Sequence, residues 1–150
     1  MSPILSQLVR FFEDDGWPFE QISDLPALHT GFSGENGKWT CYAHAREEVH
    51  QFVFYSLLPV NTPPDKLDAM AEFMTRANYG MIVGNFELNY EDGEVRYKTS
   101  IDIGDGDLSL VRSRIEGIPV RLEQIWAESA SSGRDPAAVA DSMAQRLIGR

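Results

Sequence analysis

The histidines are the side chains of this 150-residue sequence that are best suited to bind a metal. Asn36-Gly37 is typical of a two-residue β-hairpin turn, and a hairpin centred there sets His29 directly opposite His44 on one face. Zinc needs at least a third protein ligand. His50 would reach the pair only if the next turn had an odd number of residues. The apolar side chains of the following strand would then be out of phase with the hairpin face that carries Phe32 and Cys41. We therefore expect two ordinary exposed or half-buried histidines, with a metal site on His29 and His44 as the alternative.

A second group of polar side chains comprises Asp102, Asp105 and Asp107, which stand beside two glycines. Such carboxylates could bind calcium or supply acid–base chemistry. The spacing does not match an EF-hand, because Gly106 falls between the last two acids and no glutamate follows at the required distance. The end of a strand followed by a helix cap at Asp107 accounts for the same residues. We therefore expect no metal site here.

Cys41 is the one residue that could act as a thiol nucleophile. On an extended strand its parity is opposite to that of His44, so local geometry places no base beside it. The sequence also has no nucleophile elbow, no HExxH or paired CxxC motif and no phosphate-binding glycine loop. These observations predict no catalytic residue and no cofactor, and hence a protein that is not an enzyme.

Composition sets the broad class of the protein. With 43% hydrophobic residues over 150 positions, the chain can close one core and is too short for two ordinary domains. A formal net charge of −10 argues against nucleic acid or an anionic membrane as partner, because both attract Lys and Arg. The single cysteine and the lack of a signal-peptide pattern favour the reducing cytoplasm. No apolar run approaches the roughly 18 residues that cross a bilayer.

Apolar periodicity in the first half predicts one helix and three strands. Helical spacing follows Pro3 and ends at Asp15-Gly16. Alternating strands then flank Asn36-Gly37, and this turn sets Phe32 opposite Cys41. The run QFVFYSLLP, residues 51–59, is apolar on both parities and is typical of the most buried strand of a sheet.

The second half begins with a helix for which Thr62 is the expected cap, and Asn78 and Gly80 are expected to end it in left-handed conformations. A hairpin turning at Asp92-Gly93 then aligns Leu88 with Tyr97. The predicted fold is α+β: an antiparallel five-stranded sheet with helices packed on one face, in the order α-β-β-β-α-β-β-α with a further helix at the end.

The last part of the chain is predicted to be helical and divided by a hinge. A helix starts near Asp107, the sequence Gly-Ile-Pro at 117–119 breaks it, and residues 136–148 form a final helix. We assign residues 1–130 to a single domain and residues 131–150 to a hinge and C-terminal helix.

Two sets of apolar residues are candidates for contact with other proteins. Five aromatic residues exceed what one face of a small sheet hides under two helices, and they are candidates for a partner-binding surface. Three residues give the middle helix apolar side chains on two adjacent stripes, one of which could contact a second copy of the chain. The aromatic set is Trp39, Tyr42, Phe52, Phe54 and Tyr55, and the helical set is Met70, Phe73 and Met74.

The run from Tyr55 to Ile103 resembles the YbjN-like family, small bacterial proteins described as sensory transduction regulators, and is closest to cyanobacterial members. The similar elements are the Tyr-Ser strand that exits at a proline, the Arg-Ala-Asn-Tyr-Gly helix end, the Gly-Asn-Phe-Glu-Leu strand and the Asp-Gly turn that leads to Arg-Tyr-Lys-Thr-Ser. The tail beyond Leu110 departs from the family pattern.

The resemblance implies a fold like that of type III secretion chaperones, which are acidic, homodimeric and non-catalytic and which hold segments of client proteins. It supplies no catalytic residues. The expected function is therefore a cytoplasmic, homodimeric adaptor or chaperone-like protein that binds a client protein segment, with neither nucleic acid nor membrane as partner. The alternative is a regulatory or sensory domain that responds to a small ligand, a metal or pH.

Overall fold

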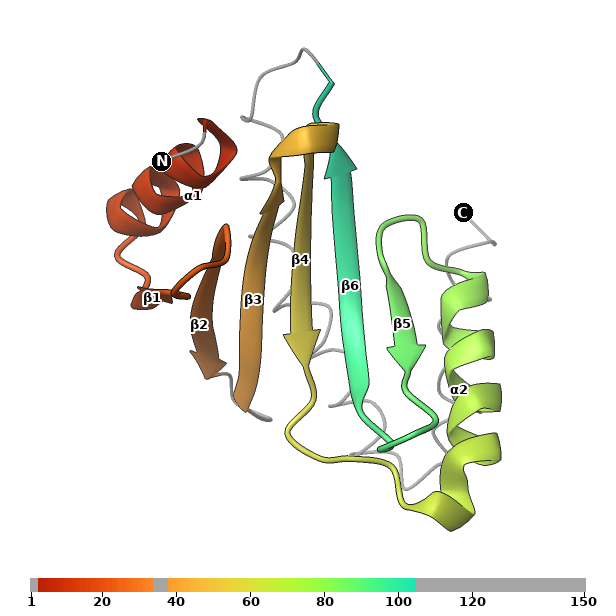
Figure 1. The fold of residues 1–150 in the computed structure, drawn as a ribbon. Coiled ribbons are helices and arrows are strands. Elements are labelled where there is room, and N and C mark those ends of the chain that lie inside the picture. The colour runs from red at the N-terminus through yellow and green to blue at the C-terminus, as the bar shows by residue number, and fades with distance from the viewer. Residues whose placement is uncertain (1–2, 34–37, 105–150) are drawn as a thin grey trace.

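The computed structural model describes residues 3–33 and 38–104 as an α+β fold built on one antiparallel sheet (Figure 1). The strand order in the sheet is β1-β2-β3-β4-β6-β5. The elements are α1 (Pro3–Asp14), β1 (Phe19–Gln21), β2 (Ala27–Ser33), β3 (Lys38–Arg46), a 3₁₀ turn (Glu47–Val49), β4 (Gln51–Leu57), a 3₁₀ turn (Pro64–Lys66), α2 (Leu67–Tyr79), β5 (Asn85–Leu88) and β6 (Val95–Asp102).

The predicted fold class is confirmed, but the predicted strand count is wrong by one. The sheet has six strands because Phe19–Gln21 also forms a short edge strand, which pairs with β2. Its alignment is held by the Thr30 hydroxyl, which donates to the Pro18 carbonyl at 2.6 Å. The predicted helices beyond Asp107 and the hinge at 131–150 lie outside the described residues.

Both described helices pack on the same face of the sheet, here called the core face, as predicted. Their apolar side chains join a single buried cluster with alternate residues of the strands. α1 contacts β3 and α2 contacts β5, so the two helices lie toward opposite margins of the sheet (Figure 1). The strand residues in the cluster are Leu28, Trp39, Cys41, Ala43, Ala45, Phe52, Phe54, Phe86, Val95 and Tyr97.

The first hairpin keeps its predicted faces but has a different register. Phe32 lies opposite Trp39 instead of Cys41, because Ser33 pairs with Lys38 and the connection spans residues 34–37. A shift of two residues leaves each side chain on its expected face, since strand side chains alternate with a period of two. The next connection, between β3 and β4, has an even count and sets Ala45 opposite Phe52, as the apolar phase requires.

The second hairpin is shifted in the same way. Leu88 lies opposite Val95 instead of Tyr97. The turn is longer than predicted because the Asn89 side chain accepts the Glu91 amide at 3.0 Å, and the Asn89 carbonyl accepts the Gly93 amide at 2.8 Å. These short-range bonds are typical of Asx turns and α-turns.

The predicted cap and the predicted C-terminal end of α2 do not form as expected, because Thr62 and Asn78 bind to distant segments instead. Thr62 does not cap α2; its amide donates to the Gly93 carbonyl at 2.7 Å, while a 3₁₀ turn leads into the helix. Gly80 has φ −98°, in the right-handed region. Asn78 stays within α2 and uses its side-chain amide on the main chain of Phe86, as a donor at 3.0 Å and as an acceptor at 2.7 Å.

Candidate binding surface on the open sheet face

The face of the sheet opposite the core face, here called the open face, carries no helix in the described part of the chain. Its side chains are the residues that alternate with the core cluster along each strand. Within the described residues it is therefore a regular surface on which another molecule could lie. Val53 is buried among its central side chains. The partly exposed ones are His29, Tyr42, His44, Tyr55, Glu87, Arg96 and Lys98.

Arg96 and Tyr55 form the most defined cluster on the open face. The Arg96 guanidinium carbon lies 4.6 Å from the centre of the Tyr55 ring, in cation–π geometry. Arg96 Nε also donates to Glu87 Oε2 at 2.7 Å, which fixes the guanidinium from one side. Tyr42 pairs with Tyr55 across β3 and β4, so an aromatic pair continues the cluster toward the centre of the sheet.

Glu87 holds two cations together on this face. Its Oε1 accepts a hydrogen bond from Lys98, and its Oε2 accepts the one from Arg96. Burial alone would raise the pKa of Glu87, but the hydrogen bonds and charges of Lys98 and Arg96 outweigh it and lower the pKa below its ordinary value. The carboxylate therefore stays ionised, and the cluster carries one excess positive charge.

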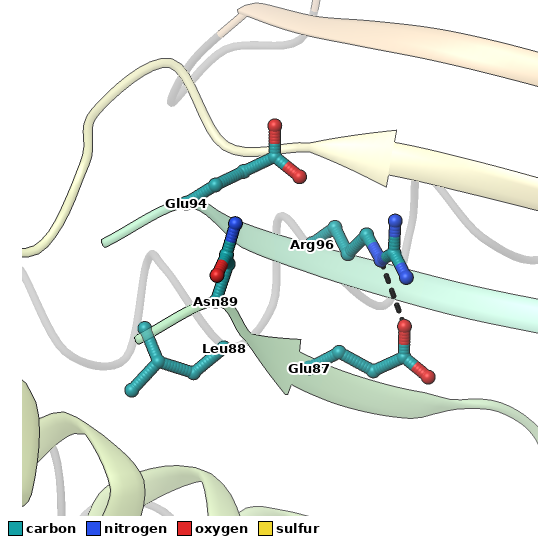
Figure 2. A pocket seen from close by; sticks show the side chains of 5 residues that line it. All are labelled: Glu87, Leu88, Asn89, Glu94 and Arg96. Atoms are coloured by element: carbon teal, nitrogen blue, oxygen red, sulfur yellow. Dashed lines mark hydrogen bonds and ion pairs between the residues drawn. The ribbon is translucent and has the colours of Figure 1, made fainter. Parts of the chain in front are cut away.

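A polar cavity of about 380 Å³ adjoins the cluster at the loop end of β5 and β6. Figure 2 shows Arg96 and Glu87 turned toward each other across the two strands, with Glu94, Asn89 and Leu88 closer to the loop. The lining offers a guanidinium, two carboxylates and one amide. Such a set suits a polar or charged group and offers little apolar surface to a drug-like ligand.

The two candidate metal ligands share the open face but do not face each other. His29 lies opposite Tyr42, with ring centres 5.2 Å apart, and His44 lies opposite Ala27 and Val53. The predicted direct opposition is wrong because of the two-residue shift in register. Among the described residues no group of three or more His, Cys, Asp or Glu side chains could hold a metal ion.

The other residues that the sequence suggested for chemistry have structural roles, as far as the structure describes them. Asp102 accepts the amide of Gly104 through its side chain at 3.1 Å, as in an Asx turn, while Asp105 and Asp107 lie outside the described residues. Cys41 is buried against Ser56, and burial raises the pKa of its thiol to about 11. The thiol is therefore a weak nucleophile at neutral pH.

The five aromatic residues predicted as a partner-binding surface divide between the two faces. Trp39, Phe52 and Phe54 are buried in the core cluster. Tyr42 and Tyr55 are half-buried on the open face. Parity along the strands separates the two groups, so the sequence contained this information once the phase of each strand was known.

The three residues predicted for the dimer contact also differ in exposure. Met74 is 4% exposed and packs in the core of its own chain, whereas Met70 and Phe73 are only partly buried. The solvent side of α2 carries charge, including the ion pair between Glu72 and Arg76. Met70 and Phe73 are therefore the members of this set that retain surface for a second chain.

Arg96 and Glu87 are the site residues that sequence reasoning did not single out. The register of the second hairpin places Arg96 directly opposite Glu87, and Lys98 reaches the same carboxylate from two positions further along β6. The stacking of Arg96 on Tyr55 joins strands from two different parts of the chain. Only strand order brings these two residues together.

These features define a class of small α+β proteins that have an open antiparallel sheet with helices on one face. The chain belongs to the YbjN family: the family model, described as "Putative bacterial sensory transduction regulator", matches residues 5–112. It is similar in fold to a solved structure titled "Crystal structure of YbjN, a putative transcription regulator from E. coli", with a TM-score of 0.56 and 12% identity, over 92% of this chain and 89% of that one. A search among curated proteins finds no match.

Membership confirms the family resemblance and the fold, and it places this chain among proteins described as regulators. At 12% identity, the structural likeness concerns the fold alone. In the part of the chain that the structure describes, no helix is long and apolar enough to span a membrane.

Proposed function

We propose that this chain is a non-catalytic regulatory adaptor of the cytoplasm that acts by binding a segment of a partner protein across its open face. The observation that carries the proposal is the Arg96 guanidinium held over Tyr55 and tied to Glu87. Tyrosine and arginine dominate binding energy at protein interfaces, because each combines a large contact area with a directed polar group.

Preorganisation supports this role for the cluster. Glu87 and the Tyr55 ring restrict the Arg96 side chain before any partner arrives, so less side-chain freedom is lost on binding. Arg96 bonds to Glu87 through its Nε, and its side chain is 39% exposed. A partner can therefore reach the guanidinium without breaking the anchor.

The experiment is capture of partners from a lysate of the source bacterium, followed by a binding assay with the purified partner. Tyr55→Ala should weaken that binding at least about tenfold, as expected for a hot-spot tyrosine. Tyr90→Ala is the matched control, because Tyr90 is 56% exposed but lies in the loop after β5. Equal affinities for the two variants would contradict the proposal.

The adaptor is proposed to act as a homodimer, with Met70 and Phe73 of α2 at the contact. Both are apolar and only partly covered within one chain. Met70→Glu should then shift the protein to a monomer in light scattering, whereas Thr75→Glu, on the exposed side of the same helix, should not. A dimer that survives Met70→Glu would place the contact elsewhere.

The polar cavity beside Arg96 favours a second candidate function, a sensory domain that binds a small charged molecule. Its guanidinium and carboxylates could pair with both groups of a zwitterion such as a free amino acid. A thermal-shift screen of the common amino acids should then raise the Tm of the wild type but not that of Glu94→Gln. No shift with any of them would remove this candidate.

A further inference from the structure

The two edges of the sheet differ in whether their main-chain hydrogen-bonding groups are occupied. At the β5 edge, the Asn78 side chain binds both the amide and the carbonyl of Phe86, in the way a neighbouring strand would. α2 also stands along this margin of the sheet (Figure 1). The β5 edge is therefore closed at its centre.

The β1 edge has no such cover among the described residues. The Ile22 amide donates to the Ala27 carbonyl at 3.0 Å, and because hydrogen-bonded pairs alternate along an antiparallel ladder, Glu20 is the next residue that bonds to β2. The amides and carbonyls of Phe19 and Gln21 therefore point away from the sheet. Gln21 is exposed, and within the described part of the chain these four groups bond to no further segment.

The segment of the chain that contains β1 carries charge of a single sign. Residues 11–27 contain five acidic side chains and no Lys or Arg. Four of the five are exposed and Asp15 is partly exposed. The acidic side chains are Glu13, Asp14, Asp15, Glu20 and Asp24.

An apolar shelf lies next to the same edge. Trp17 and Phe19 are partly exposed, and both rings pack on Phe12, with centres 5.5 and 5.7 Å away. Phe19 points to the core face and Glu20 to the open face, as neighbouring strand residues do. A strand laid along β1 would thus meet the aromatic rings of Trp17 and Phe19 on one side and the Glu20 carboxylate on the other.

We propose that the β1 edge binds an extended, basic segment of a partner protein as a seventh strand. The partner would pair its main chain with Phe19 and Gln21, place apolar side chains on Trp17 and Phe19, and place alternate Lys or Arg side chains beside the acidic residues. A second copy of this chain does not fit, because pairing of β1 with β1 would bring two acidic margins together. The inference rests on the proposed role in binding proteins and adds a separate surface and the chemistry of the segment.

The test uses full-length protein and a fluorescein-labelled peptide of seven alternating valines and lysines. Gln21→Pro removes an outward amide that the sheet itself does not use, and proline is tolerated at such edge positions. It should weaken binding at least tenfold, whereas the control Gln21→Ala should stay within about twofold of wild type. Circular dichroism and Tm verify that both variants fold.

Charge is tested by the pair Glu20→Lys and Asp24→Lys, which should also weaken binding at least tenfold. The control pair Asp68→Lys and Glu91→Lys makes the same change in net charge on α2 and in the loop after β5, and should change affinity less than about threefold. A peptide with glutamate in place of lysine should not bind to the wild type.

Three outcomes would each overturn the proposal. The first is equal peptide binding by Gln21→Pro and Gln21→Ala, and the second is binding of the glutamate peptide as tight as that of the lysine peptide. The third is no binding by the wild type up to about 1 mM peptide. Tyr55→Ala separates it from the function proposed for the open face. That variant should bind the peptide as the wild type does; if it loses the peptide while Gln21→Pro retains it, the edge proposal fails and the open-face proposal gains support.

Discussion

Glu47 caps a helix that begins more than forty residues before it: its Oε1 accepts the amide of Ile4 at 2.8 Å and also that of Leu5 at 3.1 Å. The first amides of a helix have no partner within it, and a carboxylate there also interacts favourably with the helix dipole. The turn between β3 and β4 thereby ties α1 to the sheet.

Removal of this cap should destabilise the protein. Glu47→Ala is expected to lower the free energy of unfolding by about 1 kcal/mol, the usual effect of losing a helix cap. Glu48→Ala is the control, since Glu48 is exposed in the same turn. Urea denaturation of the two variants gives the answer, and equal stabilities would show that the contact contributes nothing.

Gly93 should tolerate no side chain. Its φ is +75°, and a Cβ there would lie 2.1 Å from the Thr62 carbonyl oxygen. Gly93→Ala therefore combines a left-handed conformation with a main-chain clash and should cost at least about 2 kcal/mol.

Gly16→Ala is the matched control for this clash, because Gly16 has φ +68° with nothing within 4 Å of the added Cβ. It should cost only about 1 kcal/mol, the price of the left-handed conformation. Thermal unfolding of both variants separates the free-energy cost of the clash from that of the left-handed conformation. A Gly93→Ala variant no less stable than Gly16→Ala would mean that the loop moves away from Thr62.

Cys41 should be unreactive in the folded protein and should make stability fall at high pH. Burial raises the pKa of its thiol to about 11, from 9.0, so the folded state keeps its proton where the unfolded state loses it. The stabilisation is fully present below pH 9 and is lost as the pH rises toward 11, with a loss of about 1 kcal/mol by pH 10. Unfolding of wild type and Cys41→Ala at pH 7 and pH 10 should show this loss in the wild type alone, and Ellman's reagent should label Cys41 only after denaturation.

Glu87 should contribute stability that is lost in acid. Its pKa is lowered in the folded state by Lys98 and Arg96 in spite of burial, so the contribution is present above the unfolded pKa, near 4.5, and disappears as the pH falls through the folded pKa. Glu87→Gln should cost at most about 1 kcal/mol at pH 7, because the three side chains are partly exposed.

The control for Glu87 is Glu94→Gln, which changes the other carboxylate of the same cavity. The free energies of unfolding of wild type and Glu87→Gln should converge as the pH falls from 6 to 3. Those of Glu94→Gln should follow the wild type. Parallel curves for wild type and Glu87→Gln would show that the ion pairs do not affect stability.

The candidate site could be predicted only in part. Tyr42 and Tyr55 were among the aromatic residues singled out, because an excess of aromatic side chains is visible in the sequence. Their separation from Phe52 and Phe54 needed the phase of each strand relative to the core. Arg96 was missed because its partner Tyr55 lies on β4, and only the insertion of β6 beside β4 makes them neighbours.

Apart from β1, the sequence by itself determined the type and order of the described helices and main strands, and which residues of a strand share a face. Apolar residues recur with periods of 3.6 or 2 whatever the rest of the chain does, so Leu8 and Phe12 fall on the buried side of α1 and Cys41 in the core. Tertiary structure alone decided the register of the two hairpins, the caps from Glu47 and Asn78, and the difference between the two sheet edges. These depend on contacts between residues far apart in the chain, which no local pattern encodes.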